Sequence, residues 1–213
     1  MDEATRATLR EIATEWDKAE RLMKLAERLR GEVIQPSVNE LRYAGRRLVD
    51  AMNVAEEAEH DETKRREFGR FVDDCLFRVH CAQHDAIDAS VLFVQRAVQE
   101  YESEFGLVLL ITHFPAVAEL RAAMADADGV IVSSREFRGK RAQEYDKLAL
   151  NHLPTIITVF NTIATNRASL EALVRDRRAQ DRRFHWSNAT IVVASIIGAI
   201  LGAFLLTWLS RPH

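Results

Sequence analysis

Two histidines at helical spacing are the first residues that could do chemistry. His80 and His84 are one turn apart in a helical pattern, and Asp88 follows one turn later. Histidines at this spacing can share a metal ion, and a carboxylate can complete such a site. No glutamate stands between them as in metalloproteases, and no second helix offers a matching pair. Glu57 and His60 have the spacing of half a di-iron site, without the other half. We therefore expect no metal and no cofactor, and interpret these groups as polar residues satisfied at a helix interface.

A second pair of residues lies in the same helical pattern. Arg78 and His84 have five residues between them. The pair resembles the loose Arg-x4-6-His pattern of HEPN-superfamily ribonucleases, which are helical and often dimeric. The resemblance covers one helix, and Val79 stands where that family usually has a polar residue directly after the arginine. It implies metal-independent RNA cleavage, in which His84 assists the attacking 2′-hydroxyl and Arg78 steadies the phosphate.

A basic cluster occupies residues 135–141, where we expect a loop. Its side chains could contact phosphate in RNA, a nucleotide or a lipid. Only Phe137 is interleaved with them, and no glycine-rich phosphate loop, Walker sequence or dinucleotide fingerprint accompanies them, so we favour a solvated loop. The candidate phosphate contacts are Arg135, Arg138, Lys140 and Arg141.

Residues 189–209 form an uncharged apolar run that stops four residues before the end of the sequence. As a helix, the run would be about 30 Å long, which is the thickness of a bilayer's hydrocarbon core. Trp186 and Trp208 bracket it, where indole rings favour the membrane interface. The sequence therefore predicts a tail-anchored protein with a transmembrane helix at 186–209 and a short tail at 210–213.

The basic residues around this run predict its orientation. Only Arg211 follows the run, and short basic flanks stay in the cytoplasm. The first residues of the chain carry charges and offer no signal peptide, so we expect residues 1–185 to face the cytoplasm. The excess of arginine over lysine is typical of GC-rich bacterial genomes, which favours a bacterial inner membrane. The flanking arginines before the run are Arg175, Arg177, Arg178, Arg182 and Arg183.

One side of the predicted span is almost free of bulky side chains. Small residues recur every four positions in two adjacent rows, which lets two helices approach closely in a membrane. This pattern predicts a homo-oligomer. The rows are Ala194, Gly198 and Gly202, and Ser195, Ala199 and Ala203.

Charge is distributed unevenly along the chain. The formal net charge of −3 combines −9 in residues 1–128 with +6 in residues 129–213. Anionic headgroups would attract the basic part. Cys75 and Cys81 are six residues apart on different faces of one helical pattern and cannot bridge each other. We interpret them as core or weakly exposed thiols in a reducing compartment.

The rest of the sequence favours long helices, because glycine and proline are sparse. We expect Gly31 to end the first helix and a capping box of Ser37 and Glu40 to begin the second. The third pattern is long enough that we expect a bend near residues 85–88 or a coiled-coil partner. The predicted helices span residues 3–30, 37–59, 62–105, 115–125 and 141–185.

Two short β-branched runs make the middle of the chain ambiguous. Leu107 to Thr112 and Gly129 to Ser133 fit a small βαβ insert, but a helical interpretation fits almost as well. We favour a helix for the first run and a loop for the second. Pro154 is expected to start a new helix or to kink one.

These patterns predict a mainly α protein, with a helical cytoplasmic bundle of long helices followed by one C-terminal transmembrane helix. The leading hypothesis is a non-enzymatic, self-associating membrane protein. It would act as a scaffold, or as an oligomeric effector that perturbs or permeabilises the bilayer, with a further cytoplasmic protein as partner. The alternative is a membrane-tethered HEPN-like ribonuclease, and only this alternative implies RNA as a partner.

Overall fold

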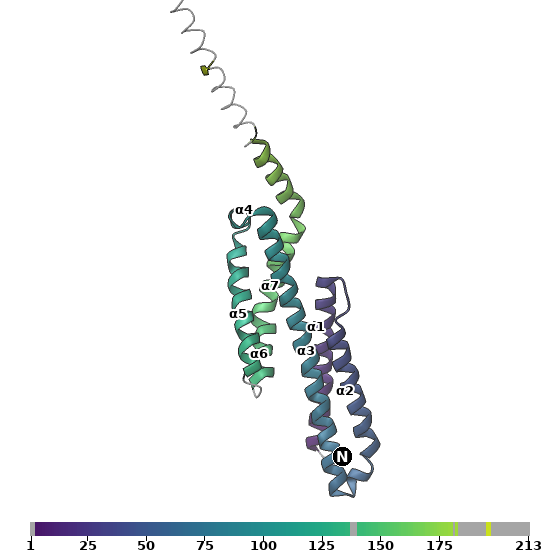
Figure 1. Cartoon of the computed structure of the whole chain (residues 1–213). Coiled ribbons are helices and arrows are strands. Elements are labelled where there is room, and N and C mark those ends of the chain that lie inside the picture. The colour runs from purple at the N-terminus through teal and green to yellow at the C-terminus, as the bar shows by residue number, and fades with distance from the viewer. Residues whose placement is uncertain (1–2, 137–139, 181, 183–194, 197–213) are drawn as a thin grey trace, which may run out of the picture. The chain divides into compact units, whose positions relative to one another are not determined.

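The computed structural model describes residues 3–136, 140–180, 182, 195 and 196 (Figure 1). Every regular element in these ranges is helical, which confirms the prediction of a mainly helical protein. The chain divides into two compact units, Met1–Ile163 and Ala164–His213. The first unit holds the helices labelled α1 to α6 and most of α7.

The first helix, α1, spans Glu3–Arg30 and ends as predicted at a glycine. Gly31 has a φ of 72°, a left-handed conformation that glycine adopts without steric cost. Its N–H donates to the carbonyl oxygen of Glu27 at 2.7 Å. The glycine thus satisfies one of the free carbonyls at the end of the helix.

The second helix, α2, spans Gln35–Val54, so the predicted capping box is wrong. The N-cap is Ile34, which makes no side-chain capping bond, and proline lies in the first turn, where its missing N–H costs nothing. Ile34 is buried beside Ala26 of α1, and the helix starts two residues earlier in the sequence than predicted. Ser37 is buried and Glu40 instead pairs with an arginine of α3.

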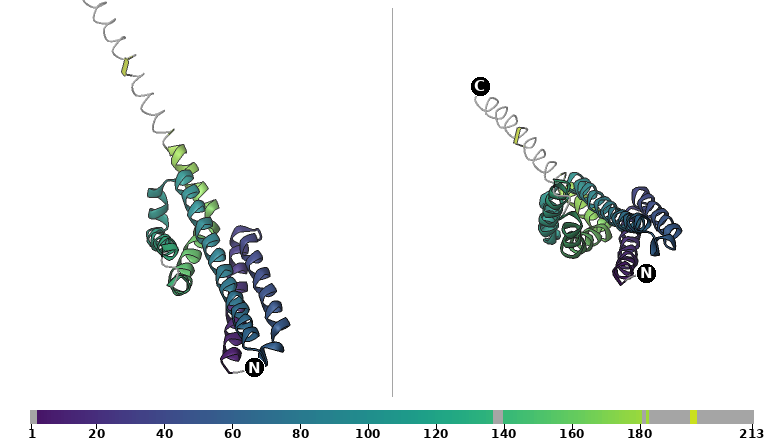
Figure 2. Two further views of the ribbon diagram at one scale, coloured as in Figure 1. Left: turned by 60° about the horizontal axis from the view of Figure 1, so that its bottom comes forward. Right: turned by 90° about the horizontal axis from the view of Figure 1, so that it is seen from below.

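The longest helix, α3, spans Glu62–Phe105 and has 44 residues, about 66 Å at the ordinary rise per residue. It follows the short helix η1, Glu57–Glu59, and Asp61 caps it by accepting a bond from the Thr63 N–H at 2.7 Å. The helix is continuous through residues 85–88, so no break accompanies the expected bend or coiled-coil partner. Partner helices of the same chain cover it along its whole length instead (Figures 1 and 2).

The first half of α3 packs with α1 and α2 into a bundle in which α2 runs antiparallel to α3 (Figure 1). In its core, small side chains lie where the helices approach one another closely, and larger side chains fill the wider spaces between the helices. Trp16 and Leu48 pack against this core from the rim. The buried members are Ile12, Ala19, Leu41, Ala44, Ala51, Val72, Cys75, Val79 and Ala82.

The second half of α3 is covered by the elements that follow it. These are α4 (Leu107–His113), α5 (Ala116–Glu136), α6 (Arg141–Lys147), the π-helical segment η3 (Leu148–His152) and α7 (Leu153–Thr165). In Figure 1, α5 and α6 lie on the opposite side of α3 from α1 and α2. Phe93 of α3 meets Phe160 of α7 edge to face, with ring centroids 5.7 Å apart.

The two ambiguous runs are both helical. The run from Leu107 forms α4, as favoured, whereas residues 129–133 lie inside α5, so the expected loop is wrong. Ile131 in that run is buried, and burial of this apolar side chain favours continuation of the helix. The π-helical turn η3 ends at His152, two residues before Pro154, which lacks the N–H that an α-helix needs.

In the second unit, residues 167–180 are helical. The predicted span at 186–209 lies outside the described residues except for Ser195 and Ile196, which are helical. None of the described helices is by itself both long and apolar enough to cross a bilayer. Leu107–His113 and Ala116–Ser134 meet that criterion only together, as a pair bent by 114°.

Candidate functional site

Polar and charged side chains meet where α1, α3 and α6 come together inside the first unit. We call this group the interhelix polar cluster. It contains the predicted catalytic histidine, two further candidates from the sequence, Asp88 and Arg141, and residues that the sequence did not single out for chemistry. Its members are Glu15 and Lys18 of α1, Gln83, His84 and Asp88 of α3, and Arg141, Tyr145 and Asp146 of α6.

His84 is at the centre of this cluster and is only 4% exposed. Its ring lies against the ring of Tyr145, with centroids 4.0 Å apart. Its Nδ1 atom is buried and has no hydrogen-bond partner among the described residues. Burial, with the positive charge of Arg141 as the next cause, lowers the pKa of His84 to about 3. The imidazole is therefore neutral at physiological pH.

Tyr145 connects α6 to α3 through its hydroxyl. The Tyr145 Oη donates to the Asp88 carboxylate at 2.7 Å. Burial and this bond raise the pKa of Tyr145 to about 12, so the phenol stays protonated. The guanidinium of Arg141 lies over the same ring, 5.6 Å from its centroid. Tyr145 thus makes a tilted ring contact, a hydrogen bond and a cation–π contact at once.

The α1 side of the cluster is held by an amide and an ion pair. The Gln83 Nε2 donates to the Glu15 backbone carbonyl at 2.9 Å and to its carboxylate at 2.8 Å. Lys18 pairs with Asp146 of α6. These contacts join residues far apart in the sequence, so the cluster connects the α1–α3 bundle to α6.

Asp85 stands next to the cluster on α3. Burial, followed by the negative charges of Glu40 and Asp88, raises the pKa of Asp85 to about 6. This carboxyl group therefore loses its proton at a higher pH than an ordinary aspartic acid, with a pKa of about 6, whereas the pKa of neighbouring His84 is about 3.

Arg78 and His84 contact different groups. The guanidinium of Arg78 donates to Glu40 of α2 at 3.1 Å and lies 5.8 Å from the centre of the Tyr43 ring. The hydrogen bond to Glu40 raises the pKa of Arg78 further above its ordinary value. The two residues therefore contact different helices, Arg78 on α2 and His84 on α6. A buried histidine with a pKa of about 3 is also a weak base for a 2′-hydroxyl.

The two cysteines are both free thiols. Cys75 is buried in the core of the bundle, and burial raises its pKa to about 11. Cys81 is half-buried, and burial raises its pKa too. A thiol with a raised pKa is a poor nucleophile, because only the thiolate reacts.

The basic cluster at 135–141 is described only in part. Lys140 is exposed. Arg141 turns towards the Tyr145 ring, and its Nε atom is buried without a partner in the described part of the chain. The side chains of Arg135 and Arg138 lie outside what the structure describes. Of the predicted phosphate contacts, Arg141 is thus engaged in the fold and Lys140 faces solvent.

The membrane-flanking arginines are described up to residue 182. Arg175, Arg177, Arg178 and Arg182 are exposed, and the Arg182 Nε donates to the Arg178 carbonyl at 3.3 Å. Ser195 is exposed as well. The other predicted residues of this region lie outside the described part: Arg183, Trp186, Trp208, Ala194, Gly198, Ala199, Gly202 and Ala203.

The histidine pair does not form a metal site together with neighbouring groups. The rings of His80 and His84 have centroids 6.5 Å apart, and His80 lies 3.7 Å from the Glu15 carboxylate. Within the described ranges, no three His, Cys, Asp or Glu side chains gather as metal ligands would. Glu57 instead approaches Lys64, at 3.5 Å.

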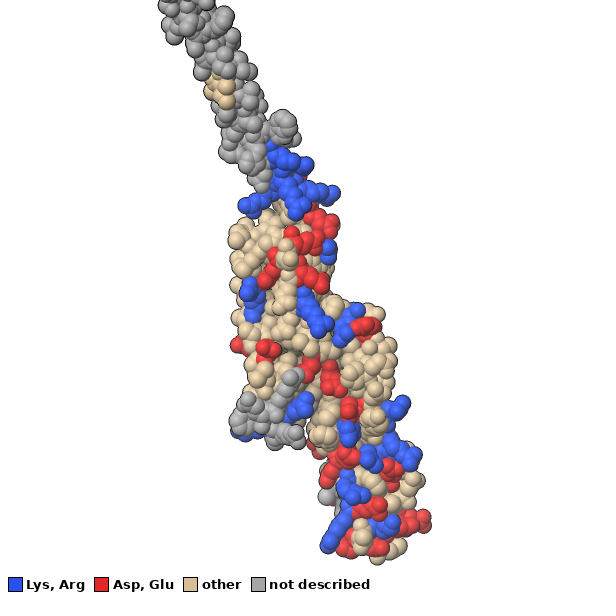
Figure 3. Space-filling model, in the orientation of Figure 1, with Lys and Arg blue, Asp and Glu red and all other residues tan. Residues whose placement is uncertain are grey.

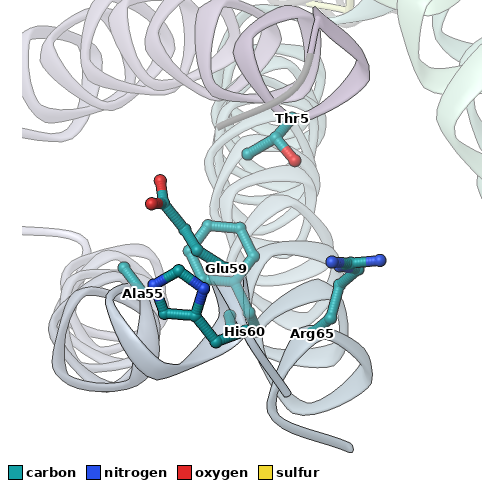
Figure 4. Close-up of a pocket in the computed structure, with 7 residues that line it drawn as sticks. Thr5, Ala55, Glu59, His60 and Arg65 are labelled. Atoms are coloured by element: carbon teal, nitrogen blue, oxygen red, sulfur yellow. The ribbon is translucent and has the colours of Figure 1, made fainter. Parts of the chain in front are cut away.

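A cavity of about 550 Å³ lies at the end of the bundle where α1 begins and α3 starts (Figure 4). Thr5 approaches from α1, while Glu59, His60 and Arg65 surround the opening from η1 and the start of α3. These last three side chains are all exposed. Charges that keep their water bind ions only weakly, so this cavity offers no desolvated site for a ligand.

Comparisons with protein families, curated proteins and solved structures find no match for this chain. The function must therefore be argued from its own residues. The residue that sequence reasoning missed is Tyr145, which the pattern presents only as part of an apolar stripe. The available signal was its hydroxyl, because a buried tyrosine needs a polar partner.

Proposed function

We propose that this chain is a non-enzymatic, self-associating membrane protein, held in the bilayer by residues 186–209. It acts as a scaffold, or as an oligomeric effector that perturbs or permeabilises the membrane. The observation that carries the proposal is the uncharged apolar run 189–209, which follows a cluster of arginines at residues 175–183. A run of this length spans a bilayer as a helix, and basic residues retain the preceding domain in the cytoplasm.

The exposed arginines of the helix at 167–180 support this proposal. Arg175, Arg177 and Arg178 are all exposed to solvent. Near an anionic membrane surface each such residue contributes about 1 kcal/mol of attraction. A basic segment just before a span would both orient the protein and hold it close to lipid headgroups.

The α4 end of the first unit also supports contact with lipid. Residues 107–118 contain no Asp, Glu, Lys or Arg. Val108 and Ile111 on α4 are exposed to solvent. Figure 3 shows a broad uncharged surface over the part of the unit around α4 and α5. Apolar side chains at the tip of a domain are typical of surfaces that meet a membrane or another protein.

The contacts of His84 favour a structural over a catalytic role. His84 and Tyr145 are buried against each other and join α3 to α6. Arg78, the other residue of the ribonuclease hypothesis, is paired with Glu40 of α2. A membrane-tethered ribonuclease remains the second candidate because of the spacing of Arg78 and His84.

The proposal is tested with full-length protein and liposomes that contain phosphatidylethanolamine and phosphatidylglycerol. We expect the protein to float with the liposomes and, as an effector, to release an enclosed dye. The matched variant carries Ile197→Lys and Leu201→Lys, which together make insertion of the span unfavourable by about 5 to 7 kcal/mol. It should lose both flotation and release.

The outcomes separate the forms of the proposal. Flotation with tight liposomes supports the scaffold and excludes the permeabilising effector. Wild-type protein that does not float contradicts membrane attachment. Cleavage of RNA by the purified protein without divalent metal, lost in Arg78→Ala, would support the ribonuclease.

A further inference from the structure

The outer groove between α2 and α3 carries an unusual concentration of arginine and aromatic side chains. The two helices are antiparallel neighbours, so residues from both line the same groove. We call this surface the Arg–aromatic face. It consists of Tyr43, Arg46, Arg47 and Asp50 of α2 and Arg70, Phe71, Asp73, Asp74, Phe77 and Arg78 of α3.

Guanidinium groups and aromatic rings alternate along this face. Arg78 lies 5.8 Å from the centre of the Tyr43 ring and 5.7 Å from that of Phe77. The Phe71 ring has Arg70 at 5.4 Å and Arg47 at 5.9 Å. These distances are those of cation–π contacts, which hold the arginines extended over the rings. These contacts favour arginine rotamers that lie over the rings, which lowers the entropy lost on binding.

The face is both exposed and hollowed. Tyr43 is 49% exposed and Phe77 is 57% exposed, although both rings are large and apolar. Two hollows of about 630 Å³ and 460 Å³ open along the groove, and Arg47 lines both of them. Aromatic rings and arginines beside such hollows are the residues that dominate the binding energy of protein interfaces.

The charges of the face distinguish between possible partners. Arg47 pairs with Asp74 at 2.6 Å and with Asp50 at 3.1 Å, and Arg46 pairs with Asp50 at 3.1 Å. The arginines are thus largely balanced by carboxylates of the same face. A polyanion such as RNA needs a surplus of positive charge, and these carboxylates would repel it. A surface that carries both signs of charge can instead place each sign opposite its counterpart on a second copy.

Self-complementarity is the property that a symmetric dimer requires. In a two-fold interface the same patch meets its own copy, so each arginine can face a carboxylate and each ring a hollow of the partner. Figure 3 shows Lys and Arg interspersed with Asp and Glu over the face of the α1–α3 bundle in that view. We infer that the Arg–aromatic face is the surface through which the first unit docks onto a second copy of this chain. This inference rests on the self-association in the proposed function and assigns it to particular residues outside the membrane.

The test measures the dimer dissociation constant of full-length protein in detergent by sedimentation velocity. Tyr43→Ala and Phe77→Ala should each raise this constant about tenfold or more, as loss of an interface anchor does. Met52→Ala and Leu92→Ala are the matched controls, because these apolar side chains are 69% and 47% exposed on the same two helices outside the face. The controls should stay within about twofold of wild type, and circular dichroism checks that every variant is helical.

Cross-linking provides a second readout that does not depend on weakening the dimer. Arg46→Cys places a thiol on the face, and a short bismaleimide should link it to its counterpart in the second copy. Leu92→Cys is the control and should not cross-link. The native thiols give little background, because the pKa of Cys75 and that of Cys81 are both raised by burial.

The possible failures are distinguishable. One outcome is that Tyr43→Ala and Phe77→Ala leave the dissociation constant unchanged while Gly198→Leu lowers the oligomer order. This outcome would overturn docking through the Arg–aromatic face and support association through the span. Wild-type protein that is monomeric at every concentration would overturn the inference. The liposome flotation experiment would then be the separate test of membrane attachment. A third outcome is a monomeric wild type that binds a fluorescent single-stranded RNA, with binding lost in Tyr43→Ala. This result would show that the face binds nucleic acid, and it would overturn the inference that a second copy of the chain docks there.

Discussion

The imidazole of His84 lies against the phenol of Tyr145, with ring centroids 4.0 Å apart, although 61 positions in the sequence separate the two residues. This contact joins the middle of α3 to α6. It also sets the ionisation of both groups, because burial in the same place lowers the pKa of the histidine and raises that of the tyrosine. The residue that resembles a catalytic base is therefore a neutral part of the packing.

Removal of the Tyr145 hydroxyl should weaken the joint between α3 and α6. In Tyr145→Phe the ring still packs on His84, but the 2.7 Å bond to the Asp88 carboxylate is lost. We expect the free energy of unfolding to fall by about 1–3 kcal/mol, measured by urea denaturation of full-length protein in detergent. Tyr43→Phe is the control, because Tyr43 is half-exposed, and should change stability by less than about 0.5 kcal/mol.

His84 should make the protein less stable in mild acid. Its folded pKa of about 3 lies below the ordinary 6.5, so between these values the unfolded chain binds a proton that the folded chain does not. This contribution to stability is complete above about pH 6.5 and is lost as the pH falls towards 3. His84→Phe keeps a ring on Tyr145 and should remove this loss, by up to about 1.4 kcal/mol per pH unit. An unchanged pH profile of unfolding would contradict the buried neutral histidine.

Asp85 should act in the opposite direction. Its folded pKa of about 6 lies above the ordinary 3.8, so the folded chain holds the extra proton between these values and stability falls as the pH rises through them. Asp85→Asn should therefore gain unfolding free energy over wild type between pH 4 and 6, reaching a plateau of about 1–2 kcal/mol above pH 6. Asp73→Asn, on the exposed surface of the same helix, is the matched control variant.

Two glycines should respond to alanine with opposite signs. Gly69 lies inside α3 and a Cβ there would meet no other atom within 4 Å, so Gly69→Ala should stabilise by about 0.5–1 kcal/mol. Gly106 ends α3 with a φ of 83°, where a Cβ is strained, so Gly106→Ala should destabilise by about 1–2 kcal/mol. Thermal unfolding of the two variants in parallel checks the sign of each change.

The small-residue rows of the predicted span give a further prediction. Gly198→Leu or Gly202→Leu should lower the oligomer order in detergent, because leucine prevents close approach of the helices. Membrane insertion should be retained, since leucine is more apolar than glycine. Retention of the wild-type oligomer in both variants would show that the span does not drive association.

The helical character of this protein could be predicted from its sequence, because it depends on local signals. Apolar residues recur at helical spacing from Glu3 to Arg30, and Gly31 ends that helix through its own backbone freedom. Asp61 similarly caps α3 by bonding to the residue two positions later. Each of these effects involves residues that are neighbours in the chain. The sequence therefore contains all the information that is needed to predict them.

Other features could not be predicted because they depend on burial by distant helices. The sequence suggested a cap at Ser37, but the N-cap is Ile34, which is buried against Ala26 of α1. The length of α3 suggested a bend or a coiled-coil partner, and helices of the same chain pack along it. The same holds for the site: the spacing of Arg78 and His84 is a property of the sequence, whereas their contacts with α2 and α6 are tertiary. The sequence alone determined a helical chain with an uncharged run near the end of the given residues. Only the fold decided that His84 is a neutral packing residue, because the free energy of a charge depends on which side chains, far along the chain, exclude water from it.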